Sequence, residues 1–410
     1  MTTATLLRQI TDYAHRADPY PLYAQLRATP VAPQENGHFL VGTYREIMQL
    51  LHDPRISSDL RNRTRREADP PTGEEAAGVP PGLIKLDPPD HDEIRRLFMS
   101  HFGPPDSPRR VETLGEELPG IVTSLIDGLA GRSRVDIVDD LAYPFPVTVV
   151  CRLLGVPPED EPRFHVWADA IVASIDPGPE KDPGARRQAE QQARVDMAGY
   201  IGGLMADRRG APREDMLSGL ANEDLSHRSI EPMELVTNSV LLFIAGHETT
   251  VNLITNGMLT LLRNPGVLER LRADPAAMPQ AVEELLRFEP PIHMLPQRTP
   301  LTDVEVAGVV IPEGAPLTLV LASGNRDPGR FRDPDRFDPW RPDNQHLGFG
   351  SGIHSCFGAP LARLEAQLAL TELIRRLDNP RLVQDPPEYR SNPILRGPRH
   401  LLVTHDGIRP

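Results

Sequence analysis

One cysteine, Cys356, lies in a glycine-rich segment, FGSGIHSCFGAPLAR, that runs from Phe349 to Arg363. A cysteine thiolate binds metal ions, and glycines at positions 350, 352 and 358 allow the backbone to approach a bulky group closely. Glycine also adopts positive φ without strain, so the N–H groups of such a loop can turn toward a buried anion. The segment therefore indicates a cysteine that is held as a metal ligand.

The residues that follow this loop predict a helix that begins close to the cysteine. Apolar residues recur at helical spacings at Leu361, Leu364, Leu368, Leu370, Leu373, Ile374 and Leu377. Cys356 would then lie near a helix N-terminus, where free N–H groups and the helix dipole favour the thiolate over the thiol. Taken alone, a cysteine beside a helix is most often a small buried residue, so further motifs must decide.

A second motif is a glutamate and an arginine three residues apart, Glu284 and Arg287. They lie in a predicted helix that opens near Pro279 and is closed by Pro290–Pro291. Residues at this spacing share a helix face, so an ion pair is expected. On a helix surface such a pair contributes only about 0.3–0.5 kcal/mol. Spacing alone does not decide whether Glu283 or Glu284 is the important acid.

A third motif, AGHETT at 245–250, lies inside a long apolar helix predicted from near Pro232 to Asn264. A glycine in a helix interior costs about 1 kcal/mol relative to alanine, and adjacent β-branched threonines add to this cost. Gly246 allows another group to approach the backbone, and Thr249 can donate a hydrogen bond to the carbonyl of residue 245. Without the other motifs, these residues would be interpreted as a polar seam in a buried helix.

The three motifs, in this order, resemble the cytochrome P450 family of haem-thiolate monooxygenases. The cysteine loop matches the family's pattern of a phenylalanine, two spaced glycines, a histidine two residues before the cysteine and a glycine two after it. The resemblance implies that Cys356 ligates haem iron and that Glu284, rather than Glu283, pairs with Arg287. In the family a second arginine completes this structural network, and Arg341 in the segment DPWRP resembles it.

The resemblance also implies catalytic roles for Glu248 and Thr249. Glu248 would relay protons from solvent, and Thr249 would hold the bound dioxygen through hydrogen bonds. A thiolate ligand favours O–O cleavage, which also requires protons delivered by positioned groups. The family's haem, heme b, carries two propionates that need partners where they are buried. His91 and Arg95, four apart on a predicted helix, resemble the family's propionate-binding pair.

The same resemblance implies two larger sets of residues, one that binds the haem and one that lines a substrate pocket. The implied haem-binding residues are His91, Arg95, Ala245, Arg298, Phe349, Gly350, His354 and Gly358. The candidates for a substrate pocket are Leu242, Ile292, His293, Met294, Leu295 and Ile394. For His293, a loop histidine with satisfied hydrogen bonds is an equal alternative.

Composition excludes several other classes of protein. The formal net charge of −14 over 410 residues repels nucleic acid and anionic membranes. Two cysteines provide no disulfide framework, and Cys151 in an apolar stretch is expected to be a core residue. No uncharged apolar run reaches the roughly 18 residues that a membrane span needs, and the first 27 residues lack the apolar core of a signal peptide. These features predict a soluble protein of the cytoplasm.

The expected fold is mainly α with a small β-rich lobe, that is, a P450-like helical fold around a buried haem. No linker, repeat or low-complexity tract divides the chain, so residues 1–410 are expected to form one domain. The lobe is predicted from 20–60 and 300–325. Helices are predicted at 90–102, at 111–130 and repeatedly through 141–210, and a capping box at Thr43–Glu46 predicts another that stops at Asp53. No glycine-rich nucleotide fingerprint or phosphate loop is found.

We therefore expect a monooxygenase that inserts one oxygen atom of dioxygen into a small, largely apolar organic substrate, by hydroxylation or epoxidation. The sequence shows no flavin or ferredoxin module, so electrons are expected from a separate ferredoxin and its reductase. Candidates for the ferredoxin docking face are Arg95, Arg96, Arg109, Arg110 and Arg363. A peroxide-driven peroxygenase and a non-catalytic haem sensor remain as alternatives, which the Glu248–Thr249 pair disfavours. Neither the substrate nor the position oxidised follows from the sequence.

Overall fold

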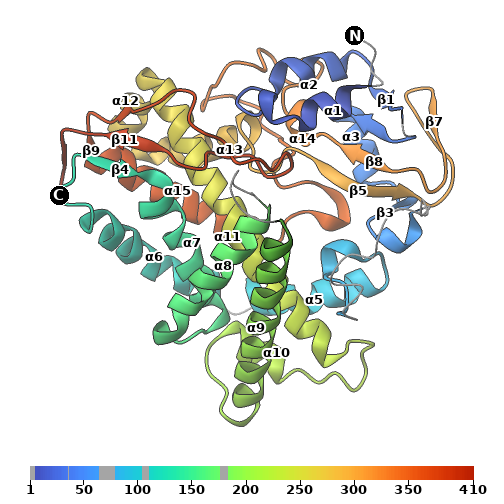
Figure 1. The fold of residues 1–410 in the computed structure, drawn as a ribbon, viewed down its shortest axis with the longest axis horizontal. Coiled ribbons are helices and arrows are strands. Elements are labelled where there is room, and N and C mark those ends of the chain that lie inside the picture. The colour runs from blue at the N-terminus through green and yellow to red at the C-terminus, as the bar shows by residue number, and fades with distance from the viewer. Residues whose placement is uncertain (1–4, 36, 64–78, 104–109, 176–182) are drawn as a thin grey trace. The chain divides into compact units, whose positions relative to one another are not determined.

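A computed structural model describes residues 5–35, 37–63, 79–103, 110–175 and 183–410 (Figure 1). The chain packs into two compact units. Unit 1 comprises residues 1–64, 122–142 and 249–410, and unit 2 comprises residues 65–121 and 143–248. The long helix α11 (Pro232–Arg263) contributes its first half to unit 2 and its second half to unit 1.

Helices make up most of the described residues, as predicted. They are α1 (Leu6–Thr11), α2 (Tyr20–Arg27), α3 (Tyr44–Leu51), α5 (Asp90–Phe102), α6 (Arg110–Asp127), α7 (Pro144–Leu154), α8 (Glu161–Ile175), α9 (Pro183–Gly210), α10 (Met216–Ala221), α11, α12 (Pro265–Ala273), α13 (Met278–Phe288), α14 (Leu321–Gly324) and α15 (Ala359–Arg376). The helices predicted at 90–102 and 111–130, and those that carry the three motifs, are confirmed. No helix among the described residues is both long and apolar enough to cross a membrane.

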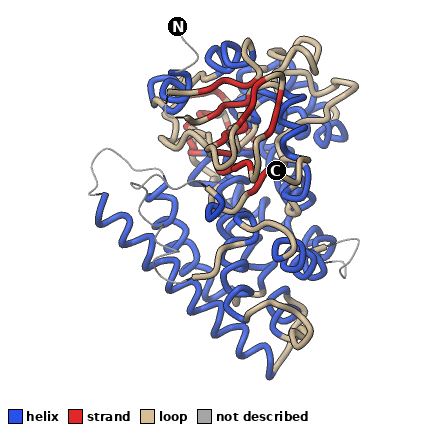
Figure 2. Tube along the Cα trace, turned by 90° about the vertical axis from the view of Figure 1, so that its right-hand side faces the viewer, coloured by secondary structure: helices blue, strands red, loops and turns tan. Residues whose placement is uncertain are grey.

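The described strands are short and all fall within unit 1, where Figure 2 draws them in red. They are β1 (Val31–Pro33), β2 (Phe39–Val41), β3 (Ile56–Ser57), β4 (Arg134–Asp136), β5 (Leu295–Pro300), β6 (Val304–Val306), β7 (Val309–Ile311), β8 (Leu317–Leu319), β9 (Leu377–Asp378), β10 (Arg381–Leu382), β11 (Leu402–Thr404) and β12 (Gly407–Ile408). The predicted lobe contains β1, β2, β3, β6, β7 and β8, whereas β5 lies outside it except for Pro300, and β4 and β9 to β12 lie wholly outside it.

The main sheet of unit 1 has the strand order β1-β2-β8-β5-β3. β2 and β8 pair in parallel, with Val41 opposite Leu319, although more than 270 residues separate the two strands in the chain. One face of this sheet packs against α3 through Ile47 and Leu50, which are almost completely buried. The apolar residues of α3 recur at helical spacing, so the helix presents one stripe to the sheet. This packing fixes the position of α3, whose C-terminal end contacts the cysteine loop.

Unit 2 consists of helices in its described part, and α8 and α9 pack side by side within it (Figure 1). Aromatic side chains fill their contact. The ring of Phe164 lies 5.0 Å from Trp167, 5.4 Å from Tyr200 and 5.2 Å from Phe243 of α11, measured between ring centroids. These edge-to-face and tilted contacts join the first half of α11 to the other helices of this unit.

Candidate functional site

The cysteine loop closes on itself before α15 begins. The backbone N–H of Cys356 donates to the carbonyl of Phe349 at 2.9 Å, and Gly350 N–H donates to Leu347 at 2.8 Å. Gly350 and Gly352 have φ values of +67° and +71°, in the left-handed region that favours glycine. Both positions therefore have the positive φ for which the sequence predicted glycine.

The two cysteines of the chain have opposite surroundings. Cys356 is exposed and lies three residues before the first residue of α15. Cys151 is completely buried in α7, and burial raises the pKa of its thiol far above the ordinary range. Only Cys356 can therefore present a thiolate to a large ligand, which fits the predicted haem.

The C-terminal end of α3 supports this loop. His52 Nε2 and the hydroxyl of Ser351 are 2.8 Å apart. A Cβ atom at Gly352 would collide with the carbonyl oxygen of Leu51, so only glycine fits there. The loop therefore depends on α3, a contact that sequence spacing did not reveal.

The structure brings Glu284, Arg287 and Arg341 together, as the resemblance implied. Arg287 donates from Nε and Nη2 to the two carboxylate oxygens of Glu284, each at 2.7 Å, and both side chains are completely buried. Its remaining N–H groups donate to the carbonyls of Asn325, Pro334 and Arg336. Arg341 Nε lies 3.5 Å from Glu284. This network fastens the segment before the cysteine loop to α13.

Glu283, the acid that spacing could not distinguish from Glu284, has different partners. Its carboxylate accepts from Arg363 Nε at 2.6 Å and lies 3.1 Å from His346 Nε2. The guanidinium of Arg363 in turn lies 4.7 Å from the ring centre of Phe349. The two neighbouring glutamates therefore hold two different parts of the same region, the preceding segment and the cysteine loop itself.

The predicted proton-relay residues lie near the middle of α11. Glu248 is 4% exposed, whereas Thr249 is half-buried and Ala245, one turn earlier, is exposed. An exposed alanine and a half-buried threonine on one face of a largely apolar helix are consistent with a helix that meets a ligand there. A Cβ atom at Gly246 would lie 3.0 Å from Val150 of α7, which explains the glycine by the close approach of that side chain.

The predicted propionate partners belong to both units. His91 and Arg95 lie one turn apart on α5, and buried His91 has its Nδ1 2.8 Å from the Asp92 carboxylate. Arg298 lies in β5 opposite Leu317 of β8 and is half-buried. His354 is half-buried in the cysteine loop, and Gly358 immediately precedes α15. These basic residues have the charge and hydrogen-bonding groups to bind two carboxylates.

Two of the substrate-pocket predictions require correction, because the side chains face the protein core. His293 is completely buried, and its Nδ1 lies 2.9 Å from the Tyr23 hydroxyl. Burial holds the pKa of this histidine well below its usual value, so it is neutral. Met294 is packed in the apolar cluster that α1 and α2 form with Val320. The alternative of a histidine held by hydrogen bonding within the protein is therefore favoured for Nδ1, whereas buried Nε2 has no hydrogen-bond partner among the described residues. Leu242, Ile292, Leu295 and Ile394 remain as candidates.

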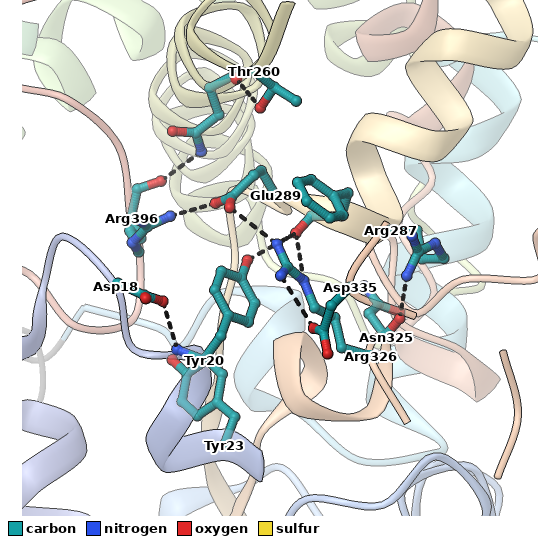
Figure 3. A network of polar contacts seen from close by, with 12 residues as sticks. Asp18, Tyr20, Tyr23, Thr260, Arg287, Glu289, Asn325, Arg326, Asp335 and Arg396 are labelled. Atoms are coloured by element: carbon teal, nitrogen blue, oxygen red, sulfur yellow. Dashed lines mark hydrogen bonds and ion pairs between the residues drawn. The ribbon is translucent and has the colours of Figure 1, made fainter. Parts of the chain in front are cut away.

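His293 borders a buried polar network around Glu289, shown in Figure 3. Glu289 accepts from Arg396 at 2.5 Å and from Arg326 at 3.1 Å. The guanidinium of Arg326 stacks 3.4 Å from the ring centre of Tyr20, whose hydroxyl donates to the carbonyl of Phe288 at 2.8 Å. This network ties α2 to the end of α13 and to the C-terminal part of the chain, and its role is structural.

Comparison with known proteins decides the family. Residues 39–405 match the sequence profile of the family Cytochrome P450. The chain belongs to the cytochrome P450 family. This P450 is 42% identical over 399 residues to the cytochrome P450 monooxygenase PikC of Streptomyces venezuelae, covering 94% of this chain and 91% of that protein. It is 37% identical over 355 residues to the erythromycin C-12 hydroxylase of Saccharopolyspora erythraea, covering 85% of this chain and 86% of that protein.

A solved structure supports the same assignment. The ligand-free structure of Mycobacterium smegmatis CYP164A2 superimposes with a TM-score of 0.85 at 37% identity, covering 98% of this chain and 100% of that chain. The fold is therefore the P450 fold, mainly helical with small β regions. The protein is a haem-thiolate monooxygenase that uses dioxygen and an organic substrate.

The remaining predictions concern the electron donor. Arg109 lies outside the described residues. Arg96 is exposed, and Arg95 and Arg363 are partly buried. Arg110 donates to the carbonyl of His101 at 2.7 Å, so part of its side chain is engaged within unit 2. The contacts of His52 with Ser351 and of Glu283 with His346 and Arg363 were not predicted, because each joins residues at least 60 positions apart.

Proposed function

We propose that this P450 hydroxylates a large, largely apolar natural product of the macrolide type, with Cys356 as the haem ligand. The observation that carries the proposal is the single exposed cysteine in a closed, glycine-dependent loop. The match to the family extends from residue 39 to residue 405 and includes residues of both units. We therefore propose that the whole chain acts as one P450 domain, in a reducing compartment such as the cytoplasm.

Cys356 would hold the haem iron, and His91, Arg95, Arg298 and His354 would neutralise or hydrogen-bond its propionates. When bound, the haem supplies the activation of dioxygen and the transfer of one oxygen atom to the substrate. Phe349, Gly350 and Gly358 shape the cysteine loop, and the small, exposed side chain of Ala245 on α11 would leave room for the haem. The positive charges matter because a buried carboxylate without a partner is costly.

Glu248 and Thr249 would deliver protons to the site of dioxygen reduction. Glu248 is buried, so it is positioned by packing and can exchange protons only along a defined route. Thr249 follows Glu248 directly in α11 and is half-buried. Its hydroxyl can donate a hydrogen bond, and we propose that it donates to bound dioxygen. Together they would provide an acid and an alcohol at adjacent positions of α11.

The macrolide assignment is supported by one of the hydroxylases among the relatives. The erythromycin C-12 hydroxylase acts on a macrolide, and this chain covers 86% of that protein at 37% identity. The remaining pocket candidates, Leu242, Ile292, Leu295 and Ile394, are all aliphatic. Aliphatic side chains favour an apolar ligand through burial of its surface, at about 25 cal/mol per Å². The substrate is therefore expected to be larger than the small molecule suggested by the sequence alone.

Electrons would come from a separate ferredoxin and its reductase. An acidic ferredoxin is favoured because Arg96 is exposed on α5, the helix that bears the predicted propionate partners His91 and Arg95. Charge complementarity mainly accelerates encounter, so reduction should slow as salt increases. Salt-independent reduction kinetics would argue against this partner.

Two measurements test the proposal. Ferric protein is titrated with macrolide lactones, long-chain fatty acids and small monoterpenes, and substrate binding is followed by the change of haem spin state in the absorption spectrum. Saturable shifts with macrolides alone, followed by a hydroxylated product in the reconstituted reaction, support the substrate class. Shifts restricted to fatty acids or monoterpenes would overturn it. The Cys356→Ser protein should lose the red-shifted carbon monoxide spectrum of a thiolate-ligated ferrous haem, and its retention would overturn the ligand assignment.

A further inference from the structure

The ring of Phe349, the first residue of the cysteine loop, is held on several sides. The Arg363 guanidinium lies 4.7 Å from its centre, and the imidazole of His346 lies 6.0 Å away at an angle of 52°. The carbonyl of Phe349 accepts the backbone N–H of Cys356 at 2.9 Å. Any displacement of this residue would therefore be transmitted to the hydrogen bond at the cysteine.

Glu283 holds both groups that contact the ring. It accepts from Arg363 at 2.6 Å and 2.9 Å, in a bidentate arrangement, and lies 3.1 Å from His346 Nε2. The backbone N–H of Gly348 donates to His346 Nδ1 at 3.0 Å. Because Nδ1 accepts, the neutral ring carries its proton on Nε2 and donates it to Glu283. We call Glu283, His346 and Arg363 the Phe349 clamp.

The clamp contains one anion and one cation at neutral pH. Burial tends to raise the pKa of Glu283, but the hydrogen bonds from His346 and Arg363 outweigh it and lower this pKa to about 2. For Arg363, the hydrogen bond with Glu283 raises the pKa, burial opposes the rise, and the charge of the Cys356 sulfur adds to it. The Arg363 guanidinium lies against the ring of Phe349, whose carbonyl accepts the Cys356 N–H, so its charge is next to the cysteine loop and Glu283 compensates it.

We infer that the Glu283–Arg363 ion pair is a positioning device that balances charge beside the Cys356 thiolate and thereby sets the reduction potential of the haem. The inference rests on the proposed assignment of Cys356 as the ligand. A reduced haem carries one more electron than an oxidised one, so a nearby cation favours reduction and a nearby anion opposes it. The two charges have opposite effects, and their pairing holds the potential between the two extremes.

The direction in which each substitution should shift the reduction potential of the haem follows from these charges. Glu283→Gln keeps the shape and the hydrogen-bonding capacity of the side chain but leaves Arg363 without its counter-charge, so the potential should rise. Arg363→Gln removes the cation, so the potential should fall. The double variant loses both charges and should lie between the single variants, near the wild-type value. Arg363→Lys keeps the charge and should restore most of the wild-type potential.

The experiment is a spectroelectrochemical titration of the purified, haem-loaded proteins at low ionic strength, where screening is weakest. Glu372→Gln is the matched control, because it removes the partner of Arg375, 2.8 Å away on the same helix, without touching the cysteine loop. Its potential should equal that of the wild type. Opposite shifts for the two single variants support the inference, and shifts of the same sign or no shifts overturn it.

The carbon monoxide spectrum and the thermal unfolding of every variant are recorded in parallel. A clamp that only stabilised the fold would lower the unfolding temperature of both single variants without moving their potentials in opposite directions. If Cys356→Ser kept the thiolate spectrum, the ligand assignment would fail whatever the potentials showed. Failure of the clamp and failure of the proposed function are therefore seen in different measurements.

Discussion

The carboxylate of Asp327 accepts the backbone N–H of Tyr44 at 2.9 Å, although 283 positions separate the two residues in the chain. Tyr44 is the first residue of α3, so this contact satisfies one of the N–H groups that a helix leaves unpaired at its start. α3 in turn supports the cysteine loop through Leu51 and His52. A side chain close to α14 thus stabilises a helix on which the site depends.

We predict that Asp327→Ala destabilises the protein by about 1 kcal/mol, the usual effect of losing a helix cap. Thr43→Ala should change the unfolding free energy much less, because the Thr43 side chain makes no capping hydrogen bond at the start of α3. Chemical unfolding followed by circular dichroism measures both. A larger loss for Thr43→Ala than for Asp327→Ala would show that the threonine caps this helix in solution.

This pair of residues also shows where sequence reasoning failed. Thr43–Glu46 has the pattern of a capping box, and the helix does begin at Tyr44, so the boundary was predicted correctly. The cap itself was assigned wrongly, because Thr43 makes no such bond and its place is taken by Asp327 from a distant segment. Local sequence patterns predict where a helix begins, whereas long-range packing decides which atoms accept hydrogen bonds from the unpaired N–H groups at its start.

Because the ion pair between Glu284 and Arg287 is completely buried, we predict that even the conservative substitution Arg287→Lys greatly lowers the stability of the protein. Arg287 makes five hydrogen bonds, two of them to Glu284. Lysine has three donors and no planar fork, so Arg287→Lys should leave buried groups unpaired and cost about 3–5 kcal/mol. We expect a strongly lowered unfolding temperature and poor haem retention on purification.

A suitable control for Arg287→Lys is Arg132→Lys, which alters an exposed bidentate pair with Asp140 at 2.9 Å and 2.6 Å. Exposed pairs of this kind contribute about 0–1 kcal/mol, so little change is expected. Equal stability losses in the two variants would show that burial of the Glu284 pair does not matter.

The site was predictable where its residues are neighbours in sequence and was not where they come together by folding. The cysteine loop and the Glu284–Arg287 pair are each contained in one short segment, so spacing and residue type located them. His293 was assigned to a substrate pocket because it lies close to the other candidates in sequence. Its ring instead faces Tyr23, 270 positions away, and residue types and local spacing give no signal for such a contact.

Buried His38 predicts a dependence of stability on pH. Burial, together with the charge of Arg63, lowers its pKa from 6.5 to about 4, and its Nε2 lies 2.7 Å from the Thr318 hydroxyl. Between these two pH values the unfolded chain binds a proton that the folded protein does not. The unfolding free energy should therefore fall as pH decreases from about 6.5 to 4, by up to about 3 kcal/mol from this residue.

His38→Gln removes that proton and keeps a side chain that can hydrogen-bond Thr318. Urea unfolding at a series of pH values should show a smaller decrease for the variant than for the wild type, and the difference should arise within the window from about 6.5 to 4. His293 titrates below its usual pKa in both proteins, so part of the decrease will remain. Parallel curves across the window would show that the pKa of His38 is the same in the folded and unfolded states.

Loss of the Thr249 hydroxyl on α11 should lower the amount of product formed per electron consumed. It should not weaken substrate binding. Thr249→Ala removes a hydroxyl at a half-buried position directly after Glu248, so protons should reach the site of dioxygen reduction less effectively. Substrate should still bind with a normal spin-state shift, while product per electron consumed falls several-fold and hydrogen peroxide rises. Thr249→Ser, which keeps the hydroxyl, should recover most of the coupling. Thr255→Val is the control in the same helix, because the Thr255 hydroxyl is buried and donates to the carbonyl of Val251 at 2.7 Å. If Thr249→Ala and Thr255→Val uncouple the reaction equally, the effect comes from a disturbed helix and not from the Thr249 hydroxyl.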